Sequence, residues 1–78
     1  MIGIRLSELP IGTMAIVGDI VLPPARIDRL AALGIVTGME ISVEQRHPVY
    51  VLRSDESLLA LEEELARGIT VHPSTDER

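Results

Sequence analysis

The sequence contains no cysteine, no lysine and one aromatic residue, Tyr50. The lack of cysteine excludes disulfides, thiolate zinc sites, iron–sulfur clusters and cysteine nucleophiles. A single tyrosine cannot line the groove that proline-rich peptides occupy, nor supply the stacking platforms that single-stranded nucleic acids need. No apolar run approaches the roughly 20 residues of a membrane-spanning helix. We therefore expect no membrane insertion, no proline-rich ligand and no bound nucleic acid.

The composition is that of one small folded domain. The chain has 78 residues, of which 46% are hydrophobic, enough for an aliphatic core. Its formal net charge of −5 has the wrong sign for a surface that tracks a phosphate backbone. We expect a single domain over residues 1–78, with its core in residues 6–71 and a frayed tail at residues 72–78.

The first third of the chain predicts a turn, a strand and a helix. Residues 6–12 read as a capped turn, because Pro10 stops any helix and Gly12 gives the backbone freedom to turn. Residues 13–20 are mostly apolar and β-branched and predict a strand, with a bulge or a turn at Gly18-Asp19. Pro24 is then suited to the first position of a helix.

The predicted helix runs from Pro24 to about Leu33. Ile27, Leu30 and Ala31 share one stripe at helical spacing, which we expect to be its buried face, with Leu33 at the edge of the stripe.

Two glycines after this helix predict its ending and the turn that follows. Gly34 stands where a helix needs a left-handed residue, so that Ile35 can fold back onto Leu30 in a Schellman ending. Gly38, after Thr37, stands where a type II turn requires positive φ. We expect both glycines to turn the chain directly from the helix into a strand.

The remaining residues predict short strands and one helical turn. A helical piece at 62–68 has acids first, then arginine and glycine, as the helix dipole favours. Hairpin turns are expected at His47-Pro48 and at residues 54–57. Closure would remove exposed edges from so short a sheet, so we expect a small curled sheet or barrel with the helix at one opening. The expected strands are residues 39–44, 49–52, 58–61 and 69–71.

A pattern spread over most of the chain resembles the FeoA family of small ferrous iron transport proteins. Its elements are weak singly, but their order and spacing together are specific. They are Leu6-x-x-Leu9-x-x-Gly12, Ala15 with Val17, Arg29-Leu30-x-x-Leu33-Gly34-Ile35-x-x-Gly38, and Leu61-x-x-x-x-Ala66-x-x-Ile69-x-Val71.

The resemblance implies a mainly β fold, an SH3-like barrel of about five strands, with one α-helix after the first strand and a short helical turn before the last. It also implies a cytoplasmic accessory protein, not an enzyme, that contacts the cytosolic GTP-binding part of the FeoB transporter. The chain departs from many relatives at Thr37, where they carry proline, and in its short hairpin at His47-Pro48.

The same fold pattern resembles the C-terminal domain of repressors related to the diphtheria toxin repressor, which follows a helix-turn-helix segment. The sequence begins at Met1 without such a segment, so we expect a stand-alone domain, and a sensory or interaction domain of a metal-dependent repressor is the alternative. Neither resemblance implies a bound cofactor, and the oligomeric state is left open.

The residue types and their spacing offer little support for a metal site or for catalytic residues. Glu44, His47 and His72 are the candidate ligands for ferrous iron, but no third ligand accompanies either histidine at fixed spacing. No combination of serine, histidine and acid and no phosphate-binding loop is present, so we expect no catalytic residues.

A protein partner would have to be bound through aliphatic and arginine side chains. Arg26 and Arg29 can pair with carboxylates, and arginine is enriched at interfaces. Leu30 and Leu33 lie on or beside the helical stripe, and Met14 is a flexible apolar side chain suited to adaptable contact. We predict a partner-binding surface from these five residues.

Overall fold

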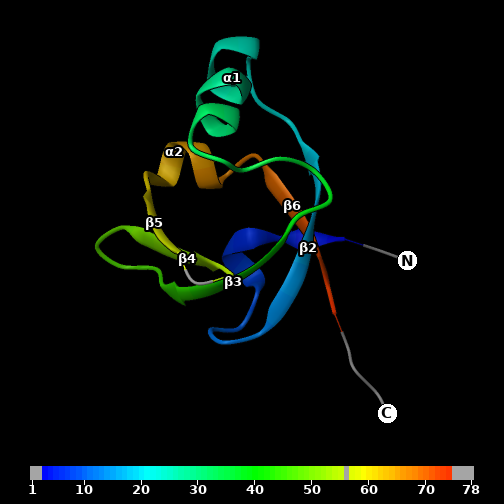
Figure 1. The fold of residues 1–78 in the computed structure, drawn as a ribbon, viewed down its shortest axis with the longest axis vertical. Coiled ribbons are helices and arrows are strands. Elements are labelled where there is room, and N and C mark those ends of the chain that lie inside the picture. The colour runs from blue at the N-terminus through cyan, green and yellow to red at the C-terminus, as the bar shows by residue number, and fades with distance from the viewer. Residues whose placement is uncertain (1–2, 56, 75–78) are drawn as a thin grey trace.

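A computed structural model describes residues 3–55 and 57–74. Six antiparallel strands form one sheet, with a short 3-10 helix and two α-helices between them (Figure 1). None of the helices in the described residues is long and apolar enough to cross a membrane. The elements are β1 (Ile4–Arg5), η1 (Leu6–Glu8), β2 (Met14–Ile20), α1 (Pro24–Ala32), β3 (Glu40–Gln45), β4 (Tyr50–Ser54), β5 (Ser57–Leu61), α2 (Glu63–Ala66) and β6 (Ile69–Pro73).

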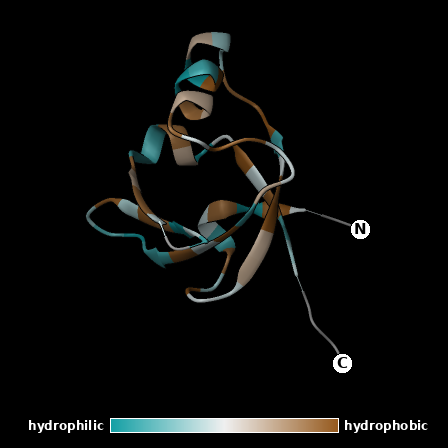
Figure 2. Cartoon of the chain, in the orientation of Figure 1, coloured by the Kyte–Doolittle hydropathy of each residue, from teal (hydrophilic) through white to brown (hydrophobic). Residues whose placement is uncertain are grey.

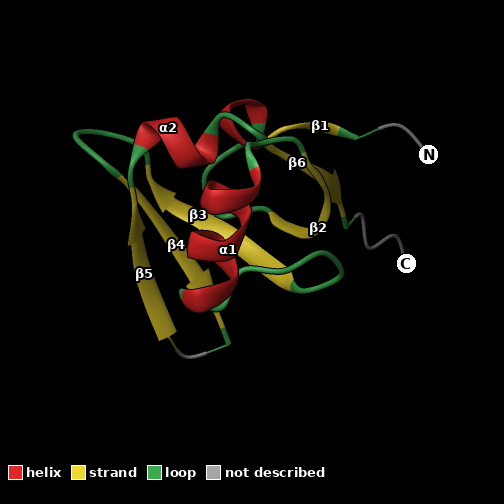
Figure 3. Cartoon of the chain, turned by 90° about the horizontal axis from the view of Figure 1, so that it is seen from above, coloured by secondary structure: helices red, strands yellow, loops and turns green. Residues whose placement is uncertain are grey.

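The sheet curls without closing. Its strand order is β1-β6-β2-β3-β4-β5, so β1 and β5 are the two edges. The views in Figures 1 and 3 show the sheet bent around the core, with α1 and α2 at one end. The mainly β, SH3-like fold is confirmed, but the expected closure is wrong. A two-residue β1 pairs only with β6 and leaves β5 uncovered.

Two further details of the predicted topology are wrong. The prediction lacked β1, so α1 follows the second strand and not the first. Two residues are too few for any alternation to be visible in a sequence, and β1 exists because Ile4 pairs with Val71. The strand β6 also extends through His72 and Pro73, which we had placed in the tail, because both pair with β2. Residues 75–78 of the predicted tail lie outside the described residues.

Of the bulge or turn predicted at Gly18-Asp19, the structure has a bulge in β2. The register between β2 and β6 shifts between Val17 and Ile20, and Gly18 lies in the shift. A Cβ atom at Gly18 would stand 2.7 Å from Nε2 of His72. A larger residue at this point would therefore have to displace the imidazole of β6, which packs directly against the bulge.

The core is aliphatic and lies inside the curl of the sheet. The buried side chains come from every strand from β2 to β6, together with Leu6 and Leu9 beside η1. Arg46 holds the segment after η1 against the sheet, because its Nη2 donates a hydrogen bond to the carbonyl oxygen of Leu9. Ser42 is buried although it is polar and stands between the buried residues Ile41 and Val43 of β3; it pairs with Met14 and Arg53 of the neighbouring strands.

Candidate docking surface around α1

The sequence fixes both ends of α1. Pro24 occupies the start of the helix, and the carbonyl of Pro23 accepts hydrogen bonds from two backbone amides of the first turn, at 2.9 and 3.1 Å. At the other end the N–H of Gly34 donates to Ala31 and the N–H of Ile35 donates to Leu30, both at 2.9 Å. These two bonds define a Schellman ending, as predicted. The φ of Gly34, +95°, is the left-handed value that this ending requires.

The second glycine also has its predicted conformation. Gly38 has φ of +98°, and the N–H of Met39 donates to the carbonyl of Val36 at 3.3 Å. The turn is therefore type II with glycine in its third position. Thr37, which replaces the proline of many relatives, donates its hydroxyl to the carbonyl of Gly18 at 2.8 Å and so ties the turn to the bulge of β2.

Most of α1 lies outside the core. Leu30 is fully buried, but Ile27 is 36% exposed and Ala31 is exposed, so the expectation that their shared stripe is buried is wrong for both. The reason is that Ile27 and Ala31 line an open hollow between the end of β2 and residues 35–37. The helix reaches the aliphatic core only through Leu30. It therefore carries apolar side chains that the described residues leave partly exposed.

Two ion pairs join α1 to α2. Arg26 lies 3.5 Å from Glu64 and Arg29 lies 3.6 Å from Glu62. Figure 2 shows both helices at the same end of the molecule, each with a hydrophilic part. All four side chains are about half exposed, so each pair stabilises the contact only weakly. Both arginines are thus oriented toward α2, and a partner would have to compete with its glutamates.

A hollow flanks α1 on the side of the chain that leads into it. It has a volume of about 490 Å³ and lies between the end of β2, α1 and the segment before β3. Val21, at 76% exposure, and Val36, at 49%, line it with Ile27. Exposed apolar side chains gathered in one place are typical of protein interaction sites. Sequence reasoning missed Val21 and Val36, because neither belongs to a periodic pattern.

The structure brings together only part of the predicted partner surface. Arg26, Arg29 and Leu33 lie on or at the end of α1, and Leu33 is 41% exposed. Leu30 cannot contact a partner, because it is fully buried. Met14 is exposed but begins β2, whereas α1 follows the end of β2, so about 20 Å of strand separates them. Met14 therefore belongs to a different face of the molecule.

The three candidate metal ligands do not form one group in the described residues. Glu44 accepts a hydrogen bond from Nε of Arg53 at 2.9 Å, and His47 is exposed in the β3–β4 loop. His72 lies on β6 against Gly18, with Nδ1 buried. In the described part of the chain no group of three or more His, Asp or Glu side chains could hold a metal ion.

Comparison with known proteins identifies the family. The FeoA domain matches residues 4–73. A crystal structure of an iron uptake regulatory protein (FeoA) superposes with a TM-score of 0.82 at 24% identity, covering 94% of this chain and all of the other. A FeoA-like protein from Clostridium acetobutylicum gives a TM-score of 0.83 at 28% identity, covering 100% and 94%.

A third structural relative has a somewhat longer chain. The FeoA protein from Chlorobium tepidum is 32% identical, with a TM-score of 0.82, over 96% of this chain and 74% of the other. A search of curated proteins found no match. The family match spans nearly all of the residues that make up the sheet and both helices, and so the chain belongs to the FeoA family.

Proposed function

We propose that this chain is a non-enzymatic, cytoplasmic accessory protein of ferrous iron uptake, which binds the cytosolic domain of a FeoB-type transporter and modulates it. Membership of the FeoA family supports the link to iron transport. The relative whose crystal structure is similar is itself described as an iron uptake regulatory protein. Regulation by a small domain requires a contact surface.

The observation that carries this proposal is the poor burial of α1. A nine-residue helix in a small domain ordinarily buries its apolar stripe, and here Leu30 alone is buried. Backbone hydrogen bonds fix both ends of the helix. The exposed apolar residues on it or close after it are Ile27, Leu33 and Val36. Protein interfaces commonly have apolar side chains at their centre and polar or charged side chains at their edge. The apolar residues and the two arginines of α1 match this composition.

The test measures binding of the transporter's cytosolic domain to variants of the full chain. Leu33→Asp should weaken binding about tenfold, since it places a charge in a desolvated contact. Val49→Asp is the matched control, because Val49 has nearly the same exposure, 39% against 41%, but lies in the β3–β4 loop. If Leu33→Asp binds as well as the control, the proposed surface is wrong.

A charge swap separates direct contact from helix positioning. Arg29→Glu should weaken binding, but it also places two carboxylates next to each other, because Arg29 pairs with Glu62. The double variant with Glu62→Arg restores the internal pair with reversed charges. If Arg29 contacts the transporter, the double variant stays weak. Full recovery would show that Arg29 acts only by holding α1 against α2.

A further inference from the structure

The two edges of the sheet differ in how they are protected. The β1 edge has two residues, one of them Arg5, and short charged edges discourage pairing with other chains. The β5 edge has five residues, Ser57–Leu61, with no charge and no proline. Leu58 on this strand is 58% exposed. An uncharged, apolar edge of this length is a template for a further strand.

Backbone groups are available along β5. All five of its residues pair with β4, from Ser54 opposite Ser57 to Tyr50 opposite Leu61, and no other described strand pairs with it. In an antiparallel ladder every second residue directs its N–H and C=O away from the partner strand. The free side of β5 therefore presents unpaired donors and acceptors at regular spacing.

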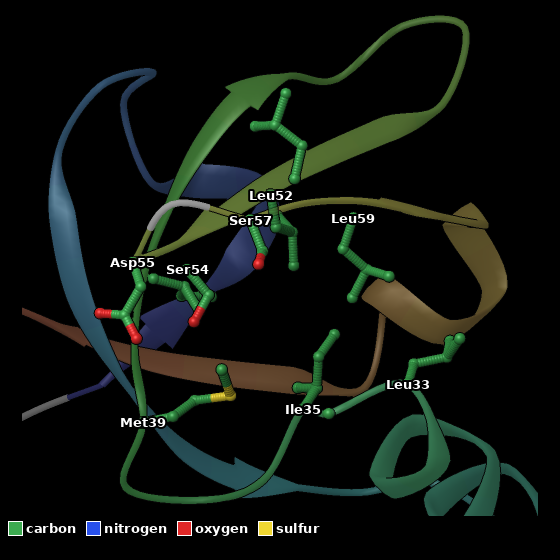
Figure 4. Close-up of a pocket in the computed structure, with 11 residues that line it drawn as sticks. Leu33, Ile35, Met39, Leu52, Ser54, Asp55, Ser57 and Leu59 are labelled. Carbon is green, nitrogen blue, oxygen red and sulfur yellow. The ribbon is translucent and has the colours of Figure 1, made fainter.

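A cavity adjoins this free edge. It has a volume of about 330 Å³ and lies between β4 and β5 on one side and residues 33–39 on the other (Figure 4). Figure 4 shows Leu33, Ile35 and Leu59 around one end and Met39 below. The volume is in the range of sites for small ligands, roughly 300–1,000 Å³. One or two side chains of an added strand could fill it.

The opposite end of the cavity is polar and negative. Ser54, Asp55 and Ser57 lie together there in Figure 4. Asp55 carries the one formal charge among the lining residues, and within the described residues no arginine or histidine lies at ion-pair distance from its carboxylate. A cationic side chain with an aliphatic stem would match both ends of the cavity.

We propose that the β5 edge and this cavity bind an extended segment of a partner protein that carries aliphatic residues at alternate positions and a lysine or arginine. The segment pairs with β5 as a seventh strand. Its inward aliphatic side chains occupy the space next to Leu33 and Leu59, and its basic side chain faces Asp55. Main-chain bonds give affinity in this mode of recognition, and the cavity gives specificity.

The test uses peptides and the full chain. A phage-displayed library of random octapeptides is selected on the protein, and enriched peptides are synthesised and titrated into ¹⁵N-labelled chain. We expect alternate aliphatic residues with a lysine or arginine. We also expect saturable shifts in β5 and residues 33–39, and every second β5 amide exchanging about tenfold more slowly with solvent.

Two variants test whether Asp55 attracts a basic side chain of the peptide. Asp55→Lys should weaken the selected peptides about three- to tenfold, and Glu8→Lys, an equal change of charge at an exposed site on η1, should leave them unchanged.

The proposal is overturned if no peptide is enriched, if enriched peptides lack basic residues, or if shifts gather around Val21 instead of β5. It is also overturned if the protein alone forms a dimer whose β5 amides are already protected, because the edge then belongs to a second copy.

Discussion

Leu30 should contribute more to stability than any other residue of α1. It is fully buried, and truncation of a buried leucine to alanine removes its transfer free energy and leaves a cavity. Leu30→Ala should therefore lower the free energy of unfolding by about 2–5 kcal/mol. Since small domains have about 5–15 kcal/mol in total, the variant should remain folded but shift clearly in urea. Equilibrium urea unfolding, followed by far-ultraviolet circular dichroism, measures the change.

The control is Leu33→Ala, the same chemical change on a side chain that is 41% exposed. It should cost less than Leu30→Ala, about 1–2 kcal/mol, because two-fifths of that side chain stays in water and its truncation leaves no enclosed cavity. In Leu30→Ala the amides of α1 should also exchange faster than those of the sheet, since the helix loses its anchor. If the two variants are equally stable, the helix is not held through Leu30 and its docking must be reconsidered.

The remaining predictions concern the glycines and the candidate ligands. Gly18→Ala should lower stability by about 1–3 kcal/mol in thermal unfolding, because its Cβ meets the His72 ring, and adding His72→Ala should recover part of the loss. Gly34→Ala should cost about 1 kcal/mol by backbone strain alone, since the space around it is open. Titration with Mn²⁺ should give no saturable amide shift near Glu44 or His47, because the Glu44 carboxylate is already held at 2.9 Å; saturation there would favour the repressor alternative.

The local backbone could be predicted because single residues dictate it. Proline restricts φ at the start of α1, whereas the positive φ at Gly34 and Gly38 is readily adopted by few residues other than glycine, and the structure agrees with the prediction at all three positions. Gly18 predicted a bulge or a turn, but the sequence could not decide between them or show that a histidine 54 residues later occupies the space. Pairing partners distant in sequence leave no local signal.

The candidate surface was harder to predict because burial depends on what the rest of the chain provides. Helical spacing placed Ile27 and Leu30 on one stripe, but only Leu30 has core beneath it. The open edge of β5 depends on the order of six strands, which no pattern within β5 reveals. The ion pairs of Arg26 and Arg29 likewise depend on α2 lying beside α1.

The two proposed contacts share one residue and should therefore influence each other. Leu33 ends α1 on the surface proposed for the transporter, and it also lines the cavity beside β5. A peptide in the cavity covers one side of Leu33, so binding at either place changes the free energy of binding at the other, by equal amounts in both directions. We expect a saturating cavity peptide to alter the affinity for the transporter domain, and the transporter domain to alter the peptide affinity by the same factor. A factor of one in calorimetric titrations of the transporter domain, with and without the peptide, would show that Leu33 does not couple the two sites.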